Sequence, residues 1–175
     1  MDVTDFESSP MMRDFPEALR RYLGLAPRET IAHAPTVRGV TRLFTCPSLE
    51  PIEALTLTFY DVEVGVSHVV SDDDVWERIA CGEEPSDDTQ FLQCDRSFSV
   101  SDLPTLVQGW QRVVDAVRNA KSCMSDNPEG ISFYHLAFGI GVDSTRVWFN
   151  PTETADPLQI ALIGAYARIK ALLSM

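Results

Sequence analysis

The sequence predicts an α+β fold, with an antiparallel sheet that carries two long helices on one face. A short N-terminal helix and an acidic insertion complete the predicted architecture. Three observations support it. Apolar and polar residues alternate in several short segments, which is the period of a strand. Apolar residues form a single stripe at helical spacing in two longer segments. A dense run of acids lies between the first predicted strands and the first of the long helices. A stripe on each helix beside alternating strands is typical of helices packed on a sheet.

The chain has 175 residues, 45% of them hydrophobic and 23% charged. These values are ordinary for a globular protein that can bury a core. We therefore expect a single α+β domain over residues 1–175. Residues 1–13 are predicted to be a loose N-terminal arm, and residues 71–100 form the acidic insertion.

A short helix is expected after the arm. Asp14 is a good N-cap, and Gly24 followed by Pro27 is a natural stop. The apolar residues of this segment fall on one face at helical spacing: Phe15, Leu19, Tyr22 and Leu23.

Three strands are then predicted, at residues 37–45, 54–60 and 61–70. In the second, apolar residues alternate with polar ones, as in a half-buried strand: Leu55, Leu57 and Phe59 against Thr56, Thr58 and Tyr60. The apolar positions then change parity between Phe59 and Val62. One flat strand would point half of these residues at water, so a turn or bulge is expected near Tyr60 and Asp61.

The acidic insertion is predicted to hold a short helix over residues 71–82, with Ser71 as its N-cap. An exposed loop over residues 83–88 and a returning strand over residues 89–100 follow. Between Ser71 and Arg96 there are nine acids and two arginines, a net charge of −7 out of −12 for the chain.

The two long helices are predicted over residues 102–121 and 156–174. Asp156 is the expected cap of the second, with Pro157 at its first helical position. Its predicted buried face consists of Leu158, Leu162, Ala165, Tyr166, Ile169, Leu172 and Leu173.

Residues 131–150 separate the two long helices and include "FGIGVDST", which resembles the start of a glycine-rich phosphate loop. A dinucleotide-binding loop needs a third glycine and a following helix. Ser144 stands where that glycine should be, and the β-prone "RVWFN" follows. The segment is therefore predicted to be a β-hairpin.

The net charge of −12 argues against nucleic acid as a ligand, because nucleic-acid binding uses clustered lysines and arginines. It suits a basic protein partner, since long-range attraction speeds such an encounter. Trp76 is a candidate anchor within the acidic segment. The predicted partner-binding residues are Asp72, Asp73, Trp76, Glu83, Glu84, Asp87 and Asp88. The alternative is that these acids only cap a helix and solvate a loop.

No metal site, cofactor or enzyme motif is predicted. His33, His68 and His135 show no pairing at metal-ligand spacing. The four cysteines, Cys46, Cys81, Cys94 and Cys123, form no Cys-x-x-Cys pair, and no nucleophile motif is present. A pocket with perturbed carboxylates beside His68 or His135 would nevertheless favour an enzyme.

No apolar segment is long enough to span a membrane, and the N-terminus lacks the apolar stretch of a secretory signal. The expected location is the cytoplasm, and a homodimer remains open.

The ending "GISFYHLAFGIGVDSTRVWFNP" followed by a helix resembles the hairpin-and-helix ending of some bacterial immunity proteins. These toxin-neutralising proteins are often small, acidic, cytoplasmic α+β domains. The resemblance implies an inhibitor that binds a cognate toxin. Class I type III secretion chaperones are similar in acidity and element order, but lack the long insertion at 71–100 and the β-rich first half. The alternative is therefore an effector chaperone, and a third reading is a small enzyme with no readable motif.

Overall fold

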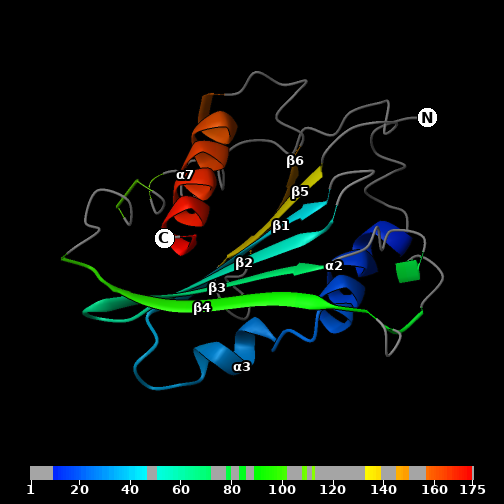
Figure 1. Ribbon diagram of the computed structural model, residues 1–175, viewed down its shortest axis with the longest axis horizontal. Helices are drawn as coiled ribbons and strands as arrows, with labels where there is room; N and C mark the ends of the chain where they lie inside the picture. Colours follow the sequence, from blue (N-terminus) through cyan, green and yellow to red (C-terminus); the bar gives the residue numbers. More distant parts are fainter. Residues whose placement is uncertain are drawn as a thin grey trace.

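A computed structural model describes residues 10–46, 51–71, 78–79, 83–85, 89–101, 108–109, 112, 133–138, 145–149 and 157–174. Six of its strands form one sheet in the order β4-β3-β2-β1-β5-β6. Every neighbouring pair is antiparallel, which confirms the α+β prediction. Figure 1 shows the sheet with helices beside it. None of the described helices has the length and apolar composition needed to cross a lipid bilayer.

The strands are β1 Gly39–Cys46, β2 Glu53–Phe59, β3 Glu63–Ser71, β4 Phe91–Ser99, β5 Phe133–Phe138 and β6 Thr145–Phe149. The helices whose full extent the structure describes are α2 Pro10–Tyr22, α3 Arg28–Ala32 and α7 Pro157–Leu173. The three strands expected in the first half are confirmed. The expected hairpin over 131–150 is confirmed too, because β5 and β6 pair antiparallel.

A turn separates β2 from β3 where the apolar pattern changes parity, as expected. The Tyr60 N–H donates to the Glu63 carbonyl at 2.9 Å, and the chain reverses over residues 60–62. Residues 71–82, expected as a helix, are described only at Ser71 and at 78–79. Residues 78–79 are helical, whereas Ser71 is the last residue of β3 and its hydroxyl accepts from the Ile52 N–H.

The N-terminal helix differs from its prediction at one end. It begins at Pro10, four residues before the cap expected at Asp14. Its end is as predicted, because Gly24 takes a φ of 64°, a conformation that glycine adopts at little cost. The N–H groups of Gly24 and Leu25 donate to the carbonyls of Arg21 and Arg20, which closes the last turn. The short helix α3 that follows was not predicted.

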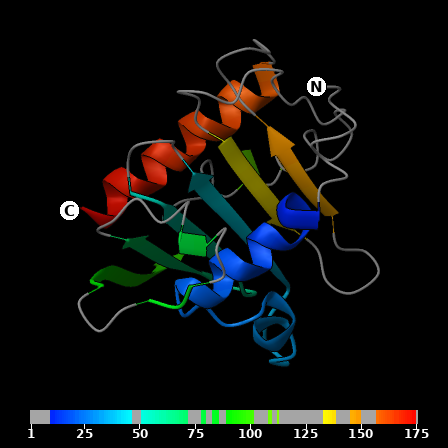
Figure 2. The same cartoon turned by 90° about the vertical axis from the view of Figure 1, so that its right-hand side faces the viewer.

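Helices cover both faces of the sheet. Figures 1 and 2 show α7 and α2 on opposite sides of it. One buried cluster joins α7 to β1, β2 and β3, and a second joins α2 to the same three strands. Four predicted α7 residues are buried: Ala165, Tyr166, Ile169 and Leu173. The helix expected over 102–121 is described only at 108–109 and 112, where it is helical, so its face lies outside the described residues.

Coverage of both faces corrects the expectation for β2. Thr56 and Thr58 were assigned to a half-exposed face, but only 4% and 9% of their surface is exposed. They lie on the face that α2 and α3 cover. Arg42 of β1 is also buried there, and its guanidinium donates to the Thr56 hydroxyl at 2.8 Å and to the Ala26 carbonyl at 3.0 Å. Burial first, and then the nearby Arg28 and Arg20, lower the pKa of Arg42 to about 10. The connection between α2 and α3 is thereby tied to the sheet.

A polar cluster holds α7 on the other face. The Glu53 carboxylate, at the start of β2, accepts hydrogen bonds from His68 Nε2 at 3.0 Å, from Lys170 Nζ at 2.7 Å and from the Tyr166 hydroxyl. Burial opposes ionisation of Glu53, but the hydrogen bonds from His68, Lys170 and Tyr166 outweigh it and lower its pKa to about 2. The carboxylate therefore stays ionised and links two strands to one helix.

Replacing Glu53 by glutamine should lower stability and flatten its dependence on pH. Because the folded pKa lies below the ordinary value of 4.5, the ionised carboxylate favours the folded state. This contribution is complete above about pH 4.5 and is lost as the pH falls toward 2. Glu53→Gln should lower the free energy of unfolding by about 1.5–3 kcal/mol at pH 7, typical of hydrogen bonds to a charged group. Urea titrations at several pH values measure both effects.

The matched control is Glu63→Gln, which removes an exposed carboxylate from the adjacent strand β3. This variant should keep the loss of stability at acid pH, because its Glu53 carboxylate is intact. An unchanged acid slope in Glu53→Gln would contradict the assignment.

Candidate protein-binding site

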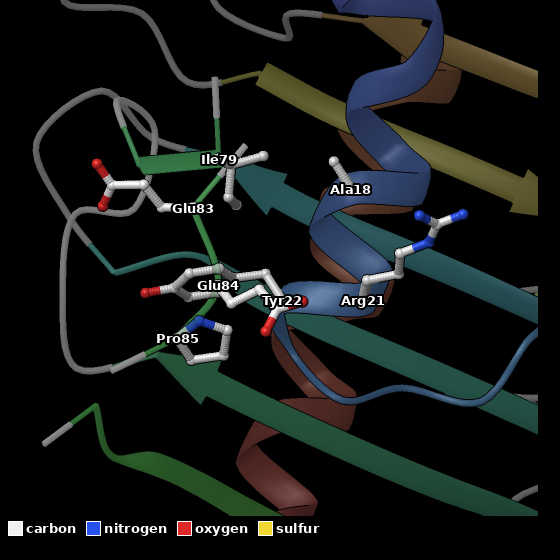
Figure 3. Close-up of a pocket in the computed structure, with 7 residues that line it drawn as sticks. All are labelled: Ala18, Arg21, Tyr22, Ile79, Glu83, Glu84 and Pro85. Atoms are coloured by element: carbon white, nitrogen blue, oxygen red, sulfur yellow. The ribbon is translucent and has the colours of Figure 1, made fainter. Parts of the chain in front are cut away.

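A pocket of about 420 Å³ lies between α2 and residues 79 and 83–85 (Figure 3). Its lining consists of Ala18, Arg21, Tyr22, Ile79, Glu83, Glu84 and Pro85. Two of these, Glu83 and Glu84, belong to the partner-binding set predicted from the sequence. The pocket therefore joins part of the acidic segment to the N-terminal helix.

Both walls of the pocket are docked on the same buried cluster. α2 contributes Phe15, Leu19 and Tyr22 to that cluster, and the second wall contributes Ile79. The Glu83 N–H donates to the Arg78 carbonyl at 2.9 Å, which holds the next residues close to this short helical segment. The pocket is thus built from two anchored elements and not from one free loop.

Tyr22 lines the pocket and is almost fully buried. Its surface is only 3% exposed, and its ring packs edge-on against Phe91 with centroids 6.0 Å apart. The Arg78 guanidinium lies over the ring, 5.7 Å from its centroid, in a cation–π arrangement. Among the described residues, the Tyr22 hydroxyl is a buried polar group without a hydrogen-bond partner. Leaving such a group unpaired costs about 1–3 kcal/mol.

Some of the charged residues around the pocket form ion pairs and others do not. Arg21 contacts Glu17 at 3.2 Å, and Arg78 contacts Glu83 at 3.4 Å. Within the described part of the chain, no cation forms an ion pair with Glu84. Glu83 is 56% exposed, so its ion pair is screened by water and contributes little. Among the described residues, Glu84 is therefore the acid of the pocket lining that no cation pairs.

The sequence-predicted site residues fall into two groups. Glu83 and Glu84 are exposed, as a docking role requires. The other five, Asp72, Asp73, Trp76, Asp87 and Asp88, lie outside the described residues. The sequence did not reveal the contribution of Arg21 and Tyr22, because nothing in its pattern relates residue 22 to residue 84. Tyr22 was assigned only to the buried face of its helix, and that assignment is confirmed.

The Glu53 cluster is the feature of the structure that comes nearest to the expected sign of an enzyme, because it sets a carboxylate with a perturbed pKa beside His68. The pKa of Glu53 is lowered to about 2, however, and a general acid or base works best with a pKa near the operating pH. Three donors already occupy the carboxylate. The cluster is suited to holding α7 against the sheet.

Other reactive groups lie apart from one another. In the described ranges, His, Cys, Asp and Glu side chains form no group of three or more that could hold a metal ion. Cys46 is fully buried, and burial raises the pKa of its thiol far above the ordinary value. A thiol in that state is a poor nucleophile.

The sequence matches no protein-family model, and it matches no curated protein sequence. The functional argument therefore depends on the geometry of the pocket and the charge around it.

Two matched Tyr→Phe substitutions test the hydrogen-bond assignments of Tyr22 and Tyr166. Tyr22→Phe removes an unpaired buried hydroxyl, so the free energy of unfolding should stay unchanged or rise by about 1 kcal/mol. Tyr166→Phe removes a hydroxyl that donates to the Glu53 carboxylate, so it should cost about 1.5–3 kcal/mol. Urea denaturation of both variants at pH 7 makes the comparison. A larger loss from Tyr22→Phe than from Tyr166→Phe would contradict the hydrogen-bond assignments.

Proposed function

We propose that this chain is a protein-binding module that binds and neutralises a basic protein, as bacterial immunity proteins do with their cognate toxins. The observation that carries the proposal is the pocket that the exposed Glu83 and Glu84 line together with the buried Tyr22.

The arrangement of the pocket supports a binding role. Protein interfaces typically combine a buried aromatic anchor with a polar, solvent-exposed rim. Tyr22 and Ile79 are buried residues of the pocket lining, and the exposed Glu83 and Glu84 form its acidic rim. The rim belongs to the stretch from Ser71 to Arg96, whose net charge is −7. A field of this sign attracts a basic protein and speeds its encounter with the pocket.

An effector chaperone is the alternative within the same class, because it would also use an acidic surface to bind a protein. The two differ in what binding does. An immunity protein abolishes the activity of its partner, whereas a chaperone releases an active partner for secretion. An activity assay of the partner in the complex separates them.

Neutralising the pocket acids should slow association. The partner is first identified by affinity capture from the native cell. Glu83→Gln/Glu84→Gln is then compared with Glu29→Gln/Glu63→Gln, which removes two exposed acids that lie outside the stretch from Ser71 to Arg96. Both variants change the net charge equally. At low salt the first should associate about threefold more slowly or worse, with a smaller change in dissociation, because rim charges act mainly on encounter.

Surface plasmon resonance at two salt concentrations measures these rates. The effect of the first variant should shrink at high salt, where exposed charges are screened. Equal association rates for the two variants would mean that Glu83 and Glu84 are only a solvated face.

A further inference from the structure

We infer that the outer edge of β4 receives an extended segment of the partner protein as an additional, antiparallel strand. The segment places a lysine or arginine opposite Asp95 and an apolar residue opposite Leu92. The inference rests on the proposed function and deepens it, because it names the conformation and the sequence pattern that the protein recognises.

The backbone of β4 offers hydrogen-bonding groups to such a segment. β4 stands at one end of the sheet order, and within the described part of the chain it pairs only with β3 (Figure 1). The Val100 N–H donates to the Val62 carbonyl at 2.9 Å, so this amide points toward β3. The backbone groups of successive residues in an antiparallel strand point to alternate sides. The N–H and C=O groups of Gln93, Asp95 and Ser97 therefore point away from β3, along the outer edge.

This edge lacks the features that usually keep a strand from pairing with another chain. It is nine residues long and contains no proline. Its register with β3 is unbroken from Ser99 to Phe91, so no bulge bends it away. Most of its side chains are exposed, and Leu92 leaves 69% of its surface in water. Such an edge suits strand addition, in which main-chain hydrogen bonds hold an extended peptide and side chains select its sequence.

The two faces of β4 carry different side chains. Phe91 packs on the buried cluster beneath α2, whereas Cys94 and Phe98 pack on the cluster beneath α7. Because side chains alternate along a strand, Asp95 lies on the α2 face and Leu92 on the α7 face. A segment that adds to the edge therefore meets the acid on one face and the exposed leucine on the other.

Asp95 selects a basic residue in the segment. Its exposed carboxylate accepts a hydrogen bond from Gln93 Nε2 at 2.7 Å, and no cation among the described residues pairs with it. Opposite charges on directly opposed residues stabilise a strand pair, and like charges destabilise it. A cation is therefore favoured opposite Asp95 and disfavoured opposite Arg96. In an antiparallel segment the residue opposite Leu92 follows the cation by three positions.

The edge is continuous with the pocket beside α2. Phe91 begins β4, and its ring packs against that of Tyr22 with centroids 6.0 Å apart. Tyr22 in turn lines the pocket together with Glu83 and Glu84. A basic protein that docks beside α2 therefore lies next to the start of β4.

Charge argues against a second copy of this chain as the occupant. Two-fold antiparallel pairing over all nine residues would place Asp95 opposite the Asp95 of the other copy. Moving the centre by one residue would place the two Arg96 side chains opposite each other. Both arrangements set like charges directly opposite. Each copy also carries a net charge of −12, whereas a basic segment is attracted.

The test uses the intact, ¹⁵N-labelled protein and a nine-residue probe, acetyl-TVTTKVTLT-amide. Paired antiparallel with β4 over its whole length, the probe sets its lysine opposite Asp95 and its leucine opposite Leu92. In the free protein the amides of Gln93, Asp95 and Ser97 should exchange rapidly with deuterium, whereas those that point to β3 exchange slowly. Probe at about ten times its Kd should slow exchange of the outward amides about tenfold.

A second peptide, acetyl-TVTKTVTLT-amide, is the matched control. It has the same composition and charge, but its lysine lies opposite Arg96. It should bind about threefold or more weakly than the probe, and Asp95→Asn should reduce this difference. Equal binding of the two peptides to the unmodified protein would overturn the role of Asp95.

Ser97→Pro tests the backbone contact. Proline is tolerated on an edge strand where its missing N–H would face water, so the pairing of β4 with β3 should persist. The variant should bind the probe about fivefold or more weakly, because it lacks one outward donor. Slow exchange at the amides that point to β3 verifies that β4 is still folded. Unchanged binding by this folded variant would contradict strand addition.

The inference as a whole fails if the outward amides keep their exchange rates at saturating probe, or if the probe does not bind at about 10 mM. It also fails if sedimentation shows a homodimer that Ser97→Pro dissociates, since a second copy then occupies the edge. These results can be told apart from failure of the proposed function. If association with the captured partner still depends on Glu83 and Glu84, the partner docks beside α2 without adding a strand. If that dependence is absent as well, the proposed function fails with the inference.

Discussion

The central strands β1 and β2 are buried on both faces of the sheet, and the positions of α2 and α7 depend on this constraint. Every residue from Val40 to Cys46 is buried, including the charged Arg42. Exposing either face would hydrate apolar residues on that side, at about 25 cal/mol for each square ångström uncovered. One face is therefore closed by α7 and the other by α2 and α3. The polar groups that fall inside are paired, Arg42 with Thr56 and Ala26, and Glu53 with α7.

The pocket is a consequence of how the second face is closed. α2 buries Phe15, Leu19 and Tyr22 on the sheet and ends immediately afterwards at the Gly24 turn. Ile79 packs into the same cluster, and Glu83 and Glu84 lie beside the end of α2 in one pocket with it. The space between these acids and α2 stays open as a pocket, because Glu83, Glu84 and Pro85 are exposed and do not pack into the core. A core requirement thus places carboxylates next to a buried tyrosine, and this combination is the basis of the proposed binding role.

Local patterns predicted most of the strands and the ends of two helices. The parity change at Phe59 located the turn before β3, and Pro157 marked the start of α7. The pattern of α2 predicted that Tyr22 is buried, but an apolar stripe does not state which sheet face it meets. For the same reason Thr56 was expected near water and is buried. Contacts such as that between Glu53 and Lys170, which are 117 positions apart, leave no periodic signal. Tyr22 and Glu84 line one pocket although they are far apart in the sequence. Only the acidic residues of the candidate site could therefore be predicted.

The central claim is that a basic protein docks on the face formed by α2 and residues 79 and 83–85. Hydrogen–deuterium exchange of the protein, alone and in complex with its captured partner, tests this claim most directly. Exchange should slow at residues 18–25 and 79–85 on binding, while the amides of α7 on the opposite face keep their rates. Protection confined to α7, with unchanged exchange at residues 18–25 and 79–85, would contradict the account.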